Sequence, residues 1–186
     1  MKILLTTLAA AVLLCAAVAT AQPPKRAPGF CLADTTGQWR DLYDYRGKVV
    51  VVEFMQTTCP HCAAFVPVLD GVAKKYAGKV QILSVALPVE PPKTGQDYMV
   101  LQKSLLDFVS ANKLSYPLLL DIGQVAASYV RSPNLAFPHL YLVDGAGMIK
   151  GNWEWGGVKE IFEGAGLSKE IDRLLAPTPS KNSIVR

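Results

Sequence analysis

The sequence has few histidines and no concentrated positive charge. Its 186 residues include two histidines, His61 and His139, and four cysteines, of which only Cys59 and Cys62 form a Cys-x-x-Cys pair. A structural zinc site takes four ligands, so a single pair argues against one. The net charge is +4, without a cluster of lysine or arginine. The composition therefore gives no support for a nucleic-acid partner or for binding to a membrane surface.

The longest apolar stretch lies at the N-terminus. Residues 1–21 carry one early charge, Lys2, and then a hydrophobic run that ends in Ala19-Thr20-Ala21. This layout is typical of a secretory signal peptide, and we expect cleavage after Ala21. The alternative is an uncleaved membrane anchor, although a spanning helix needs about 20 apolar residues. The sequence thus predicts an exported protein, periplasmic or otherwise extracytoplasmic.

The rest of the chain suits one domain with an ample core. Three prolines and a glycine in residues 22–29 predict a flexible lead-in. Residues 30–176 carry the pattern of a folded domain, and residues 177–186 are typical of a loose tail. No internal repeat is present, and we expect a monomer.

Apolar periodicity predicts alternating strands and helices. Runs of β-branched residues indicate buried strands, helical spacing indicates amphipathic helices, and an Asp-Gly pair indicates a hairpin. The expected elements are a hairpin at 30–42, strands at 49–55 and 79–87, helices at 60–76, 96–112 and 122–130, a hairpin at 138–151, and helices at 158–164 and 168–176. Trp153 and Trp155 fit either packing under the last helix or a partner surface. The order of elements predicts an α/β fold with a mixed central sheet, helices on both faces and a helical insertion before the second hairpin.

Cys59 and Cys62 fall where a buried strand ends and a helix begins. Open α/β sheets place reactive groups at this end of their strands, and the N–H groups and dipole of a helix N-terminus stabilise a thiolate. A spacing of three puts both sulfurs on one helix face, which predicts Cys59 as the exposed nucleophile and Cys62 as the resolving thiol. Pro60 suits the first helical turn. A donor or partial positive charge on His61 favours the thiolate and makes the disulfide more oxidising.

The cysteines also allow other interpretations. A structural disulfide between Cys59 and Cys62 would close a loop of two residues and restrain little of the unfolded chain. A soft-metal carrier is the alternative from another class, because the two thiolates with His61 or His139 suit Cu(I) or zinc. Disulfides persist outside the cytoplasm, and Cys31 is the odd cysteine left over. Its apolar surroundings predict a buried, unreactive side chain; the alternative is a regulatory or partner-linking thiol.

Three stretches resemble a known family. "FCLADTTG" with the run to Leu42, "RGKVVVVEFMQTTCPHC" (46–62) and "FPHLYLVDGAGMIK" (137–150) are similar to the opening hairpin, the central strand with the active-site turn, and the later hairpin of exported thioredoxin-fold redoxins of the TlpA type. The resemblance spans residues 29–176. It implies a thioredoxin fold, thiol:disulfide oxidoreductase activity on client proteins, no metal or organic cofactor, and a membrane redox partner that recycles the dithiol.

The resemblance also implies roles for residues outside the Cys-x-x-Cys turn. Pro138 matches the family's cis-proline, which lies against the dithiol and leaves the preceding backbone free to pair with a bound peptide. Phe137 would then tune the choice of partner, and Pro67 matches a kink in the active-site helix. Glu53, six residues before Cys59, matches a carboxylate that relays the proton of the inner cysteine. Burial in an apolar strand raises the pKa of such a group; the alternative is a glutamate turned toward water.

The sequence leaves the direction of electron flow open. Pro60-His61 matches the strongly oxidising DsbA type, whereas the order of elements resembles thioredoxin-like reductants that serve cytochrome maturation. His61 favours the oxidising interpretation. A thiol peroxidase of the same fold is a further alternative, but its motif needs proline and threonine or serine where this chain has Val52 and Gln56.

Overall fold

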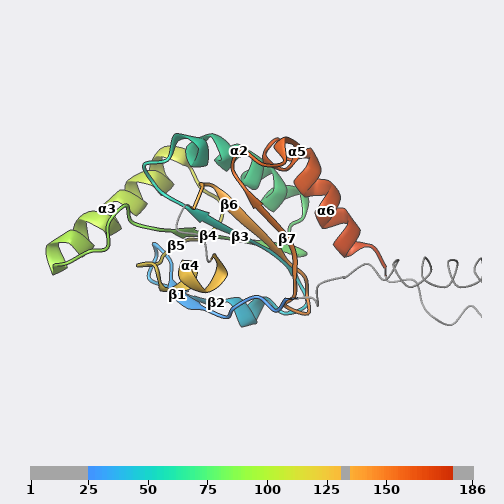
Figure 1. Cartoon of the computed structure of the whole chain (residues 1–186), viewed down its shortest axis with the longest axis horizontal. Coiled ribbons are helices and arrows are strands. Elements are labelled where there is room, and N and C mark those ends of the chain that lie inside the picture. The colour runs from blue at the N-terminus through green and yellow to red at the C-terminus, as the bar shows by residue number, and fades with distance from the viewer. Residues whose placement is uncertain (1–24, 131–134, 178–186) are drawn as a thin grey trace, which may run out of the picture.

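The chain is built around one five-stranded mixed sheet (Figure 1). The computed structural model describes residues 25–130 and 135–177. Its elements in chain order are β1 (Cys31–Ala33), β2 (Trp39–Asp41), η1 (Leu42–Tyr45), β3 (Val49–Met55), α2 (Pro60–Lys75), β4 (Val80–Ala86), α3 (Gly95–Asn112), β5 (Leu118–Leu120), α4 (Gln124–Tyr129), β6 (His139–Val143), β7 (Ile149–Glu154), α5 (Lys159–Phe162) and α6 (Ala165–Leu175). The predicted signal segment 1–21 and all but the first residue of the predicted tail lie outside the described residues.

Strand β3 is the centre of the sheet, whose order is β5-β4-β3-β6-β7. It runs parallel to β4 and antiparallel to β6, while β5 and β7 complete the parallel and antiparallel sides. All seven residues of β3 are buried. A strand covered on both faces needs apolar side chains on both, and the run of valines provides them. The mixed sheet and the central position predicted for residues 49–55 are confirmed.

Two different layers cover the sheet. Helices α2, α5 and α6 pack on one face, and their apolar side chains form one core cluster with the sheet. The β1–β2 hairpin, η1 and α4 pack on the other face. Figure 1 shows the first layer above the sheet and the second below it, with α3 extending to one side. The inner side of α3 packs against α2 and β5. The α/β class with helices on both faces is therefore confirmed.

Strand β5 was not predicted from the sequence. Its three residues are too few to show a periodicity, and they become a strand only by pairing in parallel with Ser84–Ala86 of β4. The predicted helical insertion is α3, which begins one residue earlier than expected. Thr94 and Asp97 form a reciprocal capping box at its start, which satisfies otherwise unpaired N–H groups.

The described part of the predicted lead-in, residues 25–29, is held against the turn between β6 and β7. The Ala27 N–H donates to the Gly147 carbonyl at 3.0 Å, and the Ile149 N–H donates to the Lys25 carbonyl at 2.8 Å. Ala27 is buried. The backbone groups of this extended segment therefore find hydrogen-bond partners in the turn region. The proline and glycine content of the segment gives no sign of this pairing.

Cys31 is exposed, which corrects the prediction of a buried side chain. Strand β1 pairs only with β2, in a separate two-stranded sheet. The side chain that reaches the core is its neighbour Phe30, which is 7% exposed. Because side chains alternate along a strand, burying Phe30 turns Cys31 outward.

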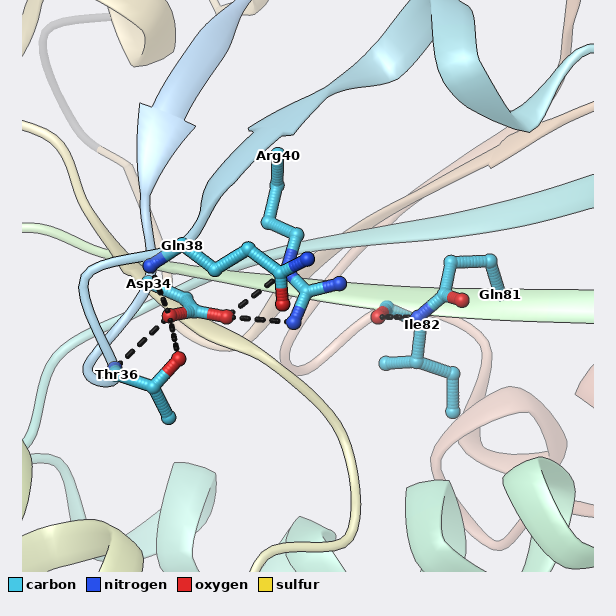
Figure 2. A network of polar contacts seen from close by, with 6 residues as sticks. All are labelled: Asp34, Thr36, Gln38, Arg40, Gln81 and Ile82. Carbon is cyan, nitrogen blue, oxygen red and sulfur yellow. Dashed lines mark hydrogen bonds and ion pairs between the residues drawn. The ribbon is translucent and has the colours of Figure 1, made fainter.

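Asp34 fixes the turn between β1 and β2 (Figure 2). Its Oδ1 accepts hydrogen bonds from the N–H groups of Thr36 and Gln38 at 2.8 and 3.0 Å, and Oδ2 pairs with the Arg40 guanidinium at 2.7 Å. The backbone of Asp34 also bridges to Leu119 of β5, so the network attaches the hairpin to the sheet edge. Burial raises the pKa of Asp34, but the hydrogen bonds from Thr36 and Arg40 outweigh it and hold the pKa below its ordinary value.

Replacing Asp34 with alanine is expected to lower the free energy of unfolding at pH 7 by about 1–3 kcal/mol, because the Thr36 and Gln38 N–H groups and the Arg40 guanidinium lose the carboxylate that holds the turn. A depressed folded-state pKa means that this stabilisation is complete above the unfolded value and is lost as the pH falls through the folded value. Urea unfolding should therefore show a smaller difference between wild type and variant at pH 3 than at pH 7. Asp107→Ala, at a largely exposed ion pair, is the control and should change little. An equal difference at both pH values would contradict the ionised role of Asp34.

Candidate active site

Cys59 lies at the start of helix α2 as its N-cap. Its backbone is extended, and its Sγ accepts a hydrogen bond from the Cys62 N–H at 3.3 Å. Pro60 is the first helical residue, a position where a missing N–H costs no helix hydrogen bond. Cys59 is half-buried, and both cysteines are free thiols. The predicted nucleophile is thus accessible at a helix N-terminus, where N–H groups and the helix dipole favour negative charge.

Cys62 lies one turn into α2 and is fully buried. Burial raises the pKa of its thiol far above the ordinary value, and the neighbouring Cys59 raises it further. Met55 and Val66 are among the apolar residues of its cluster. A thiol that holds its proton this firmly needs a base before it can act as a nucleophile.

Glu53 supplies a buried carboxyl group close enough to Cys62 to influence its titration. Its side chain lies in β3, opposite Ser84 of β4 in the parallel register, and is 2% exposed. The Ser84 hydroxyl donates a hydrogen bond to Glu53 Oε2. Burial raises the pKa of Glu53 to about 7, and the hydrogen bond from Ser84 opposes this only in part. Glu53 therefore faces the interior rather than water, and it can gain or lose a proton near neutral pH.

The loop before β6 lies against the Cys59 side chain and forms a further part of the site. The Phe137–Pro138 peptide bond is cis, Pro138 is buried and Phe137 is half-buried. The Cys59 thiol donates to the Phe137 carbonyl, with 3.8 Å between Sγ and O. The fold thus brings the proline loop to the nucleophile although 78 positions separate Cys59 from Phe137.

His61 is exposed on the first turn of α2. Its ring stacks on the indole of Trp155, with centroids 4.5 Å apart and planes 18° apart. Trp155 lies directly after β7 and is half-buried. The side chain predicted to tune the thiolate is therefore held by an aromatic contact from a distant part of the chain.

His139 is directed away from the thiols. Its ring stacks on Tyr141 at 5.0 Å between centroids, and its Nε2 pairs with the Asn152 side chain at 2.5 Å. Tyr141 belongs to the core on the α4 side of the sheet, whereas Cys62 lies in the core beside α3. Within residues 25–130 and 135–177, no three side chains of the His, Cys, Asp and Glu types are grouped as metal ligands. The arrangement expected of a soft-metal carrier with His139 is thus not formed in the described chain.

Two residues of the site were not assigned to it from the sequence. Ser84 is the only hydroxyl residue in the apolar strand β4. Glu53 is the only carboxylate in the neighbouring strand β3. A single carboxylate and a single hydroxyl residue in two neighbouring buried strands are a pattern from which a hydrogen bond between them could have been predicted. Trp155 stood out as an aromatic residue, but nothing in its local sequence connected it to His61.

A groove of about 520 Å³ opens beside the turn from β3 to α2. Residues Gln56–Thr58 form one wall, and the loop after β4 and the first half of α3 form the others. Val89 and Val100 on these walls are 70% and 64% exposed. The groove thus presents apolar side chains to solvent next to the chain neighbours of Cys59.

Comparison with known proteins places this geometry in a family. The model of the AhpC/TSA family matches residues 23–151. The chain belongs to the AhpC/TSA family. The match includes β3, the Cys-x-x-Cys turn and the cis-proline loop, which are the parts of this redoxin that form the site.

Curated relatives of this redoxin match over most of their length. Thioredoxin-like protein YneN of Bacillus subtilis (strain 168) is 25% identical over 154 residues, which cover 83% of this chain and 79% of that protein. Thiol-disulfide oxidoreductase ResA of Geobacillus kaustophilus (strain HTA426) is 29% identical over 151 residues, which cover 80% and 74%. The family and these relatives mark the chain as a thiol:disulfide oxidoreductase.

Solved structures show the same fold. A thiol:disulfide interchange protein of the thioredoxin family from Chlorobium tepidum TLS matches with a TM-score of 0.66 at 16% identity, over 84% of this chain and all of that one. A secreted Mycobacterium tuberculosis disulfide oxidoreductase homologous to E. coli DsbE matches with a TM-score of 0.60 at 22% identity, over 78% and 96%. The thioredoxin-like fold is therefore confirmed. Between residues 25 and 177, leaving out 131–134, no helix has the length and apolarity to cross a membrane.

Proposed function

We propose that this redoxin exchanges thiols and disulfides with client proteins outside the cytoplasm, with Cys59 as nucleophile and Cys62 as resolving thiol. The observation that carries the proposal is the asymmetry of the pair. Cys59 is accessible at the N-terminus of α2 and accepts the Cys62 N–H, whereas Cys62 is buried and its thiol pKa is raised. Such an asymmetry suits a two-step exchange, because only the outer sulfur can meet a client.

In the reducing direction, the Cys59 thiolate attacks one sulfur of a client disulfide. The client S–S bond breaks, one client sulfur leaves as a thiolate, and Cys59 forms a mixed disulfide with the other. Cys62 then gives its proton to the Glu53 carboxylate and attacks Cys59 Sγ. This step releases the second client thiolate and forms the Cys59–Cys62 disulfide. Two electrons pass to the client, which takes up two protons, and the oxidising direction is the same sequence reversed.

The cis-proline loop and the groove give the client a place to bind. The Phe137 carbonyl already contacts Cys59 Sγ, so a peptide chain joined to that sulfur would run beside Phe137 and Pro138. The groove with exposed Val89 and Val100 lies next to the same turn. An open, partly apolar surface around the nucleophile suits a polypeptide better than a small peroxide. The residues Val52 and Gln56, where a peroxidatic motif would need other side chains, also disfavour a peroxidase.

The place of action follows from the predicted signal segment, residues 1–21. The M. tuberculosis protein of the same fold is secreted, which is consistent with export of this chain. Disulfide exchange outside the cytoplasm requires that the dithiol be recycled across the membrane, so we propose a membrane redox partner. The chain would act as a monomer.

The exchange equilibrium with glutathione tests the activity and its direction together. The Cys59–Cys62 disulfide should react with two glutathione molecules to give the dithiol and one oxidised glutathione. Because His61 favours the thiolate, we expect a reduction potential nearer to the about −120 mV of DsbA than to the about −270 mV of thioredoxin. A value near that of thioredoxin would identify a reductant and contradict this role of His61. Failure to form the disulfide at all would contradict the proposed function.

A further inference from the structure

Trp155 contacts the two halves of the active site at once. Its indole stacks on His61 of the Cys-x-x-Cys turn, with centroids 4.5 Å apart and planes 18° apart. Its backbone N–H donates to the carbonyl of Pro138 at 3.1 Å. One residue after β7 therefore joins the start of α2 to the cis-proline loop.

The indole is itself held in place. The Phe162 ring meets it edge-on, with centroids 5.2 Å apart and planes 68° apart. Trp155 also packs at the margin of the core under α5 and α6. The indole is thus a fixed surface for a histidine whose own side chain is exposed. An exposed histidine without such a contact would exchange rotamers freely in solvent.

We propose that Trp155 is a positioning residue for disulfide exchange, which holds the His61 ring beside the Cys59 turn and thereby sets the equilibrium between dithiol and disulfide. The proposal rests on the proposed function of Cys59 and Cys62. Cys59 Sγ already has the Cys62 N–H and the Phe137 carbonyl as hydrogen-bond partners, so His61 would act on the thiolate through the dipole or charge of its ring, two residues along the chain. A ring held in one position stabilises the thiolate more than one that exchanges positions in solvent. The fixed ring therefore favours the reduced form and makes the disulfide more oxidising.

Nuclear magnetic resonance tests the stack independently of any redox activity. The ring protons of His61 should be shifted upfield by the ring current of the indole, and His61→Ala assigns them because the chain has only one other histidine. Trp155→Leu should return them toward solvent values, and Trp155→Phe should keep part of the shift. Trp153→Leu is the matched control, since Trp153 lies two residues away in the same core margin. Unshifted His61 signals in the wild type would overturn the proposal.

The equilibrium with glutathione tests the consequence. The stacking energy sets the upper limit of this effect, about tenfold in an equilibrium constant, and only the part that differs between dithiol and disulfide counts. Trp155→Leu should therefore make the disulfide less oxidising by about three- to tenfold. Trp155→Phe and Trp153→Leu should stay within about twofold of wild type. In a His61→Ala background, Trp155→Leu should cause no further shift, because the ring it holds is gone.

A shift of equal size in the His61→Ala background would mean that Trp155 acts through the Pro138 loop and would overturn the proposal. An unchanged glutathione equilibrium for Trp155→Leu in the protein that keeps His61 would also overturn the proposal. If the leucine variant fails to fold, His61→Ala in the protein that keeps Trp155 decides the question: it should make the disulfide less oxidising by the same factor, and an unchanged equilibrium would overturn the proposal. Failure of the proposed function would show differently, as exchange with client proteins that survives the loss of Cys59.

Discussion

Replacing Cys59 with serine is expected to reduce insulin reduction and glutathione exchange to the uncatalysed rate. A serine hydroxyl cannot form a disulfide, and no other described cysteine can take over. Cys62 is fully buried, and Cys31 lies in the separate β1–β2 sheet. The rate of insulin precipitation under dithiothreitol measures the loss. Turnover that persists in Cys59→Ser would contradict the assignment of the nucleophile.

Two further serine variants show that this loss is specific. Cys62→Ser should keep the attack by Cys59 but stop the reaction at the mixed disulfide, which mass spectrometry detects as a covalent adduct of glutathione. Cys31→Ser changes an exposed free thiol outside the site and should leave exchange at the wild-type rate. Loss of exchange in Cys31→Ser would instead point to a three-cysteine mechanism.

Replacing Glu53 with glutamine is expected to stabilise the reduced protein at neutral to alkaline pH. Burial raises the folded-state pKa of Glu53 from 4.5 to about 7. Between these values the folded protein binds more protons than the unfolded chain, so the free energy of unfolding falls as the pH rises. This difference in pKa corresponds to a loss of about 3 kcal/mol in the free energy of unfolding of the wild type by pH 8. Glutamine has a similar shape, carries no charge and can still accept the Ser84 hydroxyl, so it avoids this loss.

Urea unfolding of reduced wild type and Glu53→Gln from pH 4 to pH 8 measures this effect. The two proteins should have similar stability near pH 4 and diverge as the pH approaches 8. His139, whose pKa is lowered by burial, is present in both proteins, so its contribution cancels in the difference. A difference that does not change with pH would contradict a buried carboxyl group that ionises near neutrality.

The same variant should slow the second step of exchange. A positioned general base contributes typically 10²–10⁴-fold to a rate, so resolution of the Cys59 mixed disulfide should fall by about 100-fold, while the first attack on a client changes little. Stopped-flow measurement of the two steps separates them. Ser84→Ala is the comparison variant: it removes the hydrogen bond that opposes the raised pKa of Glu53 but leaves the carboxyl group in place, so it should slow resolution less than Glu53→Gln does. Equal slowing of both steps would argue against a role for Glu53 in the proton transfer to and from Cys62.

Much of the fold could be predicted because its signals are local. The valine run of β3 needs apolar cover on both faces, and the apolar spacing of α2 and α3 appears within single segments. Strand β5 could not be predicted, because three leucines become a strand only where β4 offers them hydrogen bonds. Cys31 was wrongly predicted as buried because alternation along a strand does not say which of two apolar neighbours faces the core.

The features that predict a dithiol chemistry can all be read from the local sequence: two thiols three residues apart after a buried strand, with a histidine between them and a lone carboxylate six residues before. These features depend on the short-range geometry of a strand and a helix N-terminus, which neighbouring residues fix. The surroundings of the thiols, in contrast, depend on how distant parts of the chain pack together. Glu53 meets Ser84, Phe137 meets Cys59 and Trp155 meets His61 across 31 to about 95 residues of chain, and such contacts arise from the packing of whole elements rather than from any local pattern.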